Sequence, residues 1–178
     1  ILNGFSVNNL NFTAENTVNN IIKICNIKKE DTILEIGAGA GRLAKFFLNK
    51  KFDYFATERS ETLVEKFKLL VNRDKIQLNK SNKLPFEDNS FDIVFCWSII
   101  QYLDLETFYL IFDEMIRISK KCILLGDIYE IEENSNKNYK YKSNNLKHFY
   151  IPKNLFSNMR NINITSKLGD YRICSFNN

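Results

Sequence analysis

The sequence of 178 residues has little of what several common functional sites require. It has one histidine and four cysteines, and no cysteines form a C-x-x-C pair, so no zinc-ligand spacing is recognisable. No run approaches the ~18 consecutive apolar residues of a membrane-spanning helix. The basic residues are scattered and form no dense block of the kind that binds nucleic acid. We therefore expect no metal, membrane or nucleic-acid site.

Length and composition predict one soluble domain over residues 1–178. The length is close to the ~150-residue prior for a single domain, and the charged fraction of 26% and apolar fraction of 44% are ordinary for globular proteins. The widely spaced cysteines indicate reduced thiols in a core, and we expect a cytoplasmic protein. No periodic surface stripe indicates an oligomeric state.

Strand and helix patterns alternate along the chain. Short apolar or β-branched runs predict strands at 32–36, 54–57, 76–78, 91–96 and 122–126. Apolar residues at helical spacing predict helices over 14–25, 42–49, 60–71 and 105–118. This alternation predicts an α/β fold with a doubly wound, mostly parallel sheet.

The C-terminal part of the sequence has a different pattern. The polar stretch 130–145 predicts a long loop of the kind that covers binding sites, and Pro152 predicts the start of a short helix. Two further strands, 162–165 and 171–174, flank Lys167-Leu168-Gly169-Asp170 and predict an antiparallel hairpin.

Three of the six glycines fall in the turn Gly37-Ala38-Gly39-Ala40-Gly41, between the first predicted strand and a helix. Glycine lets the backbone pass close to a ligand, and a turn at a helix N-terminus exposes free amides. The dinucleotide pattern G-x-G-x-x-G would need a third glycine where Arg42 stands. The phosphate-loop pattern G-x-x-x-x-G-K-[ST] is absent. The turn thus disfavours a nicotinamide cofactor and excludes that phosphate loop.

Acidic residues stand beside the glycine turn. Glu35 precedes it, and a carboxylate there would repel a pyrophosphate but suit a ligand with an ammonium and a sulfonium. Glu58 lies about 20 residues beyond the turn, where an acidic side chain can accept hydrogen bonds from ribose hydroxyls in either cofactor class. The charges therefore favour S-adenosylmethionine.

Two segments, Ile33 to Leu43 and Leu84-Pro85-Phe86-Glu87-Asp88-Asn89-Ser90-Phe91-Asp92-Ile93-Val94-Phe95, resemble the two most recognisable motifs of class I methyltransferases. The resemblance implies a Rossmann-like, seven-stranded sheet with an antiparallel edge strand, and S-adenosylmethionine as cofactor. Glu35 is a cofactor-binding candidate from its charge, and the resemblance implies further contacts. Gly37, Ala38 and Gly39 would contact the methionine part of the cofactor, and Glu58 would contact the ribose. Arg59 would contact a face of the adenine and Ser81 its edge, and Cys96 and Trp97 would lie beneath the sulfonium. Lys80 departs from the pattern, because the family often has an aspartate there that binds the adenine amine.

The acceptor is less well defined. A hydroxyl acceptor needs a base, and the candidates near predicted strand ends are His148, Asp127, Tyr102 and Asp104. The segment 146–156 resembles one in small methyltransferases of bacterial surface-polysaccharide gene clusters, which implies a sugar-linked acceptor. No Asp- or Asn-Pro-Pro-Tyr motif occurs, which disfavours methylation of amide or exocyclic amine nitrogens. We therefore expect O-methylation of a sugar or nucleotide-linked precursor.

Three alternatives stay open at this stage. The chain could bind the cofactor without turnover, as a methyltransferase-like module. It could methylate nitrogen or carbon in another small metabolite. A nicotinamide-dependent oxidoreductase is the third alternative, which the residue at position 42 disfavours.

Overall fold

Helices and strands alternate along most of the chain in the computed structural model, which describes residues 13–71, 73–131, 139–141, 147–149, 151–152, 162–168 and 171–177. The helices are α1 (Ala14–Ile24), α2 (Ala44–Asn49), α3 (Glu61–Leu70) and α4 (Leu105–Ile118), with 3-10 turns η1 (Arg73–Lys75) and η2 (Ile100–Tyr102). The strands are β1 (Thr32–Ile36), β2 (Asp53–Glu58), β3 (Ile76–Leu78), β4 (Phe91–Trp97), β5 (Ser119–Ile131), β6 (Tyr139–Tyr141), β7 (Lys147–Phe149), β8 (Ile151–Pro152), β9 (Ile162–Leu168) and β10 (Tyr171–Asn177).

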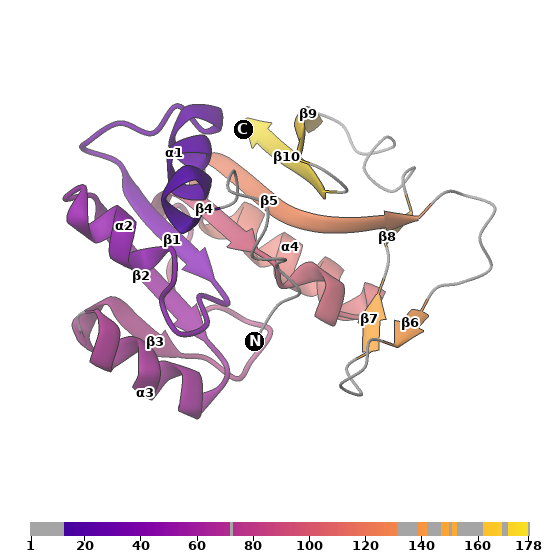
Figure 1. Cartoon of the computed structure of the whole chain (residues 1–178), viewed down its shortest axis with the longest axis horizontal. Coiled ribbons are helices and arrows are strands. Elements are labelled where there is room, and N and C mark those ends of the chain that lie inside the picture. Colours follow the sequence, from indigo (N-terminus) through magenta and orange to yellow (C-terminus); the bar gives the residue numbers. More distant parts are fainter. Residues whose placement is uncertain are drawn as a thin grey trace.

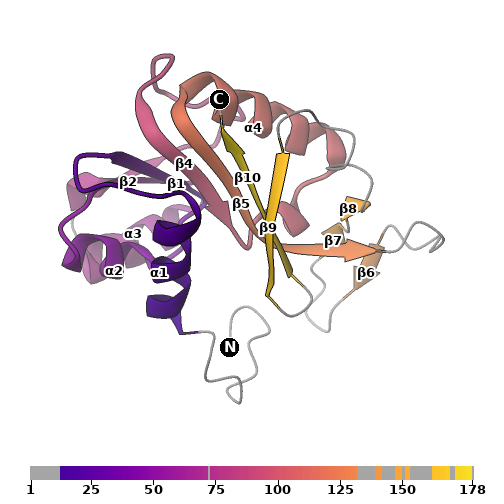
Figure 2. The same ribbon diagram turned by 90° about the horizontal axis from the view of Figure 1, so that it is seen from above.

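Five strands form a parallel sheet in the order β3-β2-β1-β4-β5. Figures 1 and 2 show α1, α2 and α3 on one face of this sheet and α4 on the other. The predicted doubly wound, Rossmann-like arrangement is confirmed for this part. The strand order reverses between the neighbours β1 and β4, and ligands of open α/β sheets bind at the carboxyl ends of the strands around such a point.

Pairing continues beyond β5. β10 runs antiparallel to both β5 and β9, so β9 and β10 form the predicted hairpin and β10 lies between two strands. β8 pairs with β5, and β6 pairs with β7. Pro152, from which a helix was predicted, lies in β8, and residues 153–161 lie outside the described residues. Within the predicted loop 130–145, β5 continues to Ile131 and β6 occupies 139–141. The seven-stranded sheet with an antiparallel edge strand stays a prediction.

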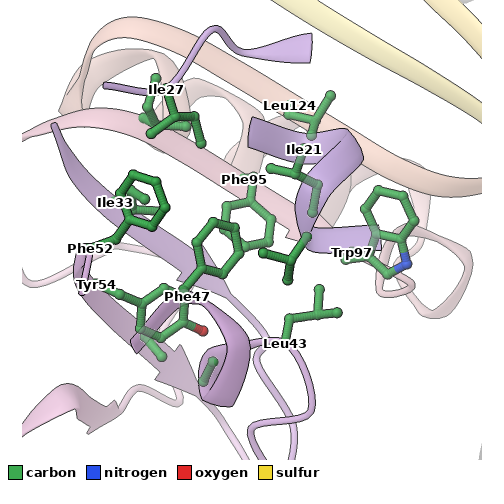
Figure 3. Packing of buried hydrophobic residues seen from close by; sticks show 14 of the residues in the cluster. Ile21, Ile27, Ile33, Leu43, Phe47, Phe52, Tyr54, Phe95, Trp97 and Leu124 are labelled. Carbon is green, nitrogen blue, oxygen red and sulfur yellow. The ribbon is translucent and has the colours of Figure 1, made fainter. Parts of the chain in front are cut away.

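The sheet separates two clusters of buried apolar side chains. Ile33 of β1 faces the cluster under α1, α2 and α3, while Leu34 and Ile36 face the cluster under α4. In the first cluster the Phe47 ring stacks on Tyr54 at 5.4 Å between centroids and lies 5.6 Å from the Phe95 ring. Figure 3 shows these three rings together. Strand alternation places Glu35 on the same face as Ile33, which brings a carboxylate to the border of an aromatic cluster.

Short polar side chains cap three of the helices. Thr13 accepts from the amide of Asn16 at 3.1 Å, as predicted for the start of α1, and Ser60 caps α3. Asp104 caps α4 by accepting from the amide of Thr107 at 2.7 Å. Among the described residues, none of the helices combines the length and apolarity that crossing a membrane would require.

Candidate functional site

A cavity of about 550 Å³ lies at the carboxyl ends of β1, β2, β3 and β4, around the point where the strand order reverses. Its volume falls in the usual range of small-molecule sites. The lining residues come from the end of β1 with the glycine turn and the residues after it, the end of β2 with α3, the segment after β3, and the end of β4 with α4. They are Glu35 to Ala40, Arg42, Leu43, Thr57, Glu58, Arg59, Leu63, Asn79, Ser81, Asn82, Leu84, Trp97, Ser98, Ile99, Tyr102, Leu103, Thr107 and Ile111.

Two glycines of the turn meet different surroundings. A Cβ on Gly37 would lie 2.7 Å from Cγ2 of Ile99, whereas a Cβ on Gly39 would meet no atom within 4 Å. Both residues have positive φ, at 72° and 60°. Gly37 is therefore required by packing against the segment after β4, and Gly39 opens directly onto the cavity.

The first three amides of the turn are already engaged, contrary to our expectation of free donors. Gly37 and Ala38 donate to the carbonyl oxygen of Thr57 at 2.8 and 3.1 Å, and Gly39 donates to Glu58 Oε2 at 2.9 Å. The reason is that the turn folds back on the end of β2, several residues before α2 begins at Ala44. A ligand phosphate would have to displace these bonds, so the geometry also disfavours a phosphate cradle.

Glu58 connects the glycine turn after β1 with the segment after β2. Besides Gly39, its carboxylate accepts from the amides of Arg59 and Ser60 at 2.8 and 2.9 Å. The side chain is buried and lines the cavity. Glu58 thus fixes the glycine turn relative to β2, a role that the sequence did not reveal.

Glu35 is the second carboxylate of the cavity, and only 3% of the residue is exposed. Its Oε2 accepts a hydrogen bond from the hydroxyl of Tyr54. Burial raises the pKa of Glu35 to about 7, against the lowering effects of the Tyr54 hydrogen bond and the Arg42 charge, while Glu58 raises it further. Near neutral pH this group is therefore poised between its neutral and charged forms.

The segment after β3 supplies polar groups to the opposite wall. Asn79 donates its amide to the carbonyl oxygen of Glu58 at 2.9 Å, and Ser81 donates its amide to Asn79 Oδ1 at 3.2 Å. Lys80 lies between them but pairs with Glu61 at 2.6 Å and does not line the cavity. The side chain of Lys80, where the sequence departs from the family pattern, therefore points to α3 and not into the cavity.

The two predicted residues at the end of β4 lie on opposite faces of the sheet. Trp97 lines the cavity and packs over Gly126, where a Cβ would lie 2.1 Å from Trp97 Cε3. Cys96 is buried in the cluster under α4 and does not line the cavity. The side chain of Cys96 faces away from the cavity because successive residues of a strand point in opposite directions. That the strand end at Cys96 and Trp97 lies beneath the sulfonium stays a prediction.

Ser98 is a lining residue that the sequence did not single out. Its hydroxyl donates to Asp127 Oδ2, and its carbonyl oxygen accepts from Gln101 Nε2 at 2.8 Å. Ser98 and Asp127 both have positive φ, at 61° and 59°, a backbone conformation that costs about 1–3 kcal/mol outside glycine and is typical of functional sites. Its place directly after a buried strand is the one signal that could have identified Ser98.

The structure separates the four candidate bases. Tyr102 lines the cavity, and burial together with the negative charge of Asp127 raises its pKa. Asp127 itself is buried and does not line the cavity, so it reaches the site through Ser98. Asp104 is used as the cap of α4 and is not a lining residue. The backbone of His148 lies in β7 close to η2, but its side chain is outside what the structure describes.

Metal ligands do not gather in this part of the molecule. Within the described ranges, no three His, Cys, Asp or Glu side chains lie together in a group that could hold a metal ion.

Comparison with known families places the chain in a class. A family model described as a methyltransferase domain matches residues 34–122, which is half of the chain. The chain therefore belongs to the methyltransferase domain family, of the class I type. All cavity-lining residues fall inside the matched range. This family implies S-adenosylmethionine as cofactor.

Individual relatives are more distant. The chain is 35% identical over 77 residues to a Methanocaldococcus jannaschii protein named "Uncharacterized protein MJ0638", and the match spans 43% of this chain but only 32% of that protein. YcgJ of Bacillus subtilis is 26% identical, with a TM-score of 0.57 over 66% of this chain and 52% of YcgJ. The chain thus spans about a third to a half of the length of these relatives.

Two solved structures match nearly the whole chain at lower identity and show the fold. PH0226 of Pyrococcus horikoshii is 15% identical, with a TM-score of 0.72 over 96% of this chain and 92% of that protein. A Thermotoga maritima protein, described as a SAM-dependent methyltransferase and possible histamine N-methyltransferase, is 18% identical, with a TM-score of 0.64 over 93% and 89%.

Proposed function

We propose that this chain is an S-adenosylmethionine-dependent methyltransferase whose cofactor binds in the cavity at the end of β1. The observation that carries the proposal is the turn at Gly39, which opens onto the cavity between two buried carboxylates, Glu35 and Glu58. The ammonium, sulfonium and ribose of this cofactor match the charge pattern, and a pyrophosphate does not.

The cavity walls match the parts of such a ligand. Glu35 faces the cationic end, beside Gly37, Ala38 and Gly39, and Glu58 faces the ribose. Arg59 and Ser81 border the adenine, together with the apolar side chains of Leu84, Ile99, Leu103 and Ile111. Trp97 closes the cavity toward the first core cluster. The bound cofactor supplies the electrophilic methyl group, and the chain contributes alignment and exclusion of water.

The acceptor part of the proposal is O-methylation of a small polar molecule, a sugar or a nucleotide-linked precursor. Support comes from the hydroxyls of Ser98 and Tyr102, which line the cavity on the side of β4, and from the sequence resemblance around His148. Tyr102, Asp127 acting through Ser98, and His148 are the proposed bases. No nucleic-acid or membrane partner is part of this proposal.

The same proposal includes the complete sheet of the class. A seven-stranded sheet with one antiparallel strand is supported by the pairing of β10 with β5 and with β9. In that arrangement the last strands lie beside β5, away from the glycine turn at the end of β1.

Ligand binding tests the cofactor assignment. We expect S-adenosylhomocysteine to raise the melting temperature and NAD to leave it unchanged, because a ligand at 100 times its Kd stabilises by about 2.7 kcal/mol. A shift with NAD alone would contradict the proposal and favour the oxidoreductase alternative.

The acceptor is identified by mass spectrometry after incubation with S-adenosylmethionine and a panel of nucleotide sugars and other small metabolites. Gain of one methyl mass on one compound identifies both the reaction and the substrate. Bound cofactor without product from any compound would favour the binding-module alternative.

A further inference from the structure

Tyr54 contacts the cavity-lining residue Glu35 but does not itself line the cavity. The residue is fully buried in β2, and its ring stacks on Phe47 with an interplanar angle of 19°. Tyr54 is paired in register with Ile33, two residues before Glu35 on the neighbouring strand. Tyr54 does not line the cavity, so it acts on a ligand there only through the hydroxyl that it donates to Glu35.

The groups around the Glu35 carboxylate come from three parts of the chain. Besides Tyr54, β2 supplies Glu58, which disfavours the charged form of Glu35, and the segment before α2 supplies Arg42, which favours it. β4 supplies Cys96, whose pKa is raised by burial and also by the Glu35 charge. Burial is the strongest influence on Glu35 and favours its neutral form.

The two carboxylates of the cavity therefore differ in their support. Glu58 accepts three backbone amide hydrogen bonds and so has partners on the protein without any ligand. Glu35 accepts one hydrogen bond from a neutral phenol in an aromatic cluster. A cation that enters beside the glycine turn would place a positive charge next to Glu35 and so favour its charged form.

We propose that Tyr54 is the positioning residue that holds Glu35 at the cavity wall, and that Glu35 exchanges a proton for the ammonium group of the ligand. Without the ligand, Glu35 retains a proton near neutral pH; when the ammonium group arrives, the carboxyl O–H bond breaks and the proton passes to the solvent. The carboxylate then pairs with the ammonium, and no electrons are transferred. This inference rests on the proposed cofactor site and adds to it a proton linkage and a role for Tyr54.

The sign of the pH dependence follows from this exchange. Below about pH 7 the carboxyl must lose a proton before it pairs with the ligand, so affinity falls as pH falls. For one linked proton the change is about tenfold in Kd per pH unit. Above pH 7 the affinity is level, because the proton has already left.

The test uses the full chain and isothermal titration calorimetry from pH 5.5 to 8. The probes are S-adenosylhomocysteine, which carries the ammonium group, and 5′-methylthioadenosine, which has the same nucleoside and a thioether but no amino acid part. We expect the wild-type affinity for the first probe to rise toward pH 7 and the affinity for the second to be independent of pH. Titrations in two buffers of different ionisation enthalpy should detect proton release only with the first.

Two variants separate positioning from packing. Glu35→Gln should bind S-adenosylhomocysteine more weakly, with a flat pH profile. Tyr54→Phe keeps the ring that stacks on Phe47 but removes a hydrogen bond that lowers the pKa of Glu35. Its affinity should therefore be reduced at pH 7 and recover at pH 8.

Several results would overturn the inference. An equal loss of affinity by Tyr54→Phe at every pH would mean that the Tyr54 hydroxyl does not act through the protonation of Glu35. A pH dependence that persists in Glu35→Gln would assign the proton to another group. Either result leaves the proposed function in place, whereas absence of S-adenosylhomocysteine binding by the wild type at any pH would overturn both.

Discussion

At the scale of single residues, Gly37 and Gly39 have the same backbone requirement but different surroundings. Both have positive φ, which costs a residue with a side chain roughly 1–2 kcal/mol. Only Gly37 is in close contact with another side chain, that of Ile99. The two positions therefore allow the needs of folding and of ligand access to be tested separately.

We expect Gly39→Ala to lose S-adenosylhomocysteine affinity with a stability loss of about 1 kcal/mol, because its Cβ enters the cavity and meets no protein atom. Gly37→Ala should lose more stability, since Ile99 must also move. Urea denaturation gives the stabilities and calorimetry gives the affinities. Unchanged affinity of Gly39→Ala would place the ligand away from the turn.

The sequence predicted some site residues better than others. Glu35 and Glu58 line the cavity, because their spacing from the glycine turn fixes them at the ends of neighbouring strands, and their contact with the cofactor stays a prediction. The side chain of Cys96 faces the cluster under α4 and not the cavity, and Ser98 was not singled out. The strand ended one residue later than predicted, and the positive φ of Ser98 has no signature in a serine.

At the scale of elements, α1 and α2 both end without glycine. Lys51 follows α2 with φ of 60°, while its amide donates to Leu48 O at 2.9 Å and the amide of Phe52 donates to Phe47 O at 3.2 Å. Asn26 has the equivalent place after α1, with φ of 48°. Glycine usually occupies this position, because a left-handed residue with a Cβ is strained.

Lys51→Gly should therefore stabilise the protein by about 0.5–1 kcal/mol, since the relief of the left-handed strain exceeds the added entropy of the unfolded chain. Lys50→Gly is the matched control, because Lys50 has an ordinary φ of −79° and gains nothing from glycine. Thermal and urea unfolding measure both variants. Equal effects of the two substitutions would contradict the explanation.

α4 also holds the cavity wall in place. Arg117 donates to the carbonyl oxygens of Leu84 and Phe86 at 3.2 and 2.8 Å and pairs with Glu114 at 2.7 Å. Leu84 in turn lines the cavity. The amide of Leu84 also donates a hydrogen bond to Glu114, 30 residues further along the chain. The proline-containing segment that resembles a methyltransferase motif is thus fixed by α4.

At the scale of the whole molecule, the buried carboxyl of Glu35 links stability to pH. Its pKa is about 7 in the folded protein, whereas the ordinary value for a glutamate is 4.5, so the folded state binds the proton more tightly than the unfolded chain does. The stability from this group is fully present below about pH 4.5 and is lost as pH rises through 7. Asp92 and Glu114, whose pKa values are lowered by hydrogen bonds and charges against the effect of burial, act in the opposite direction at lower pH.

Between pH 5 and 7 we expect the unliganded protein to lose up to about 1.4 kcal/mol of stability per pH unit through Glu35. Glu35→Gln should lack this slope, because glutamine does not titrate. Urea unfolding at several pH values within this range measures both proteins. Parallel curves for the two would show that Glu35 does not carry the linkage.

The sequence by itself determined the order of helices and strands up to residue 126, the glycine turn and the class of protein. These depend on local spacing: apolar periodicity defines the helices and strands, and a turn with three glycines is recognisable without its neighbours. The helix over 105–118 and the strand over 76–78 were predicted to the residue for this reason.

Only the tertiary structure decided how the site is assembled. Tyr54 meets Glu35, Ser98 meets Asp127, and Arg117 meets the segment at Leu84 across 19, 29 and 33 residues of sequence. Such contacts depend on strand order and on which face each side chain takes, and a shift of one residue reverses the face. The packed molecule therefore decides that Glu58 accepts hydrogen bonds from backbone amides, whereas Glu35 lies beside an aromatic cluster.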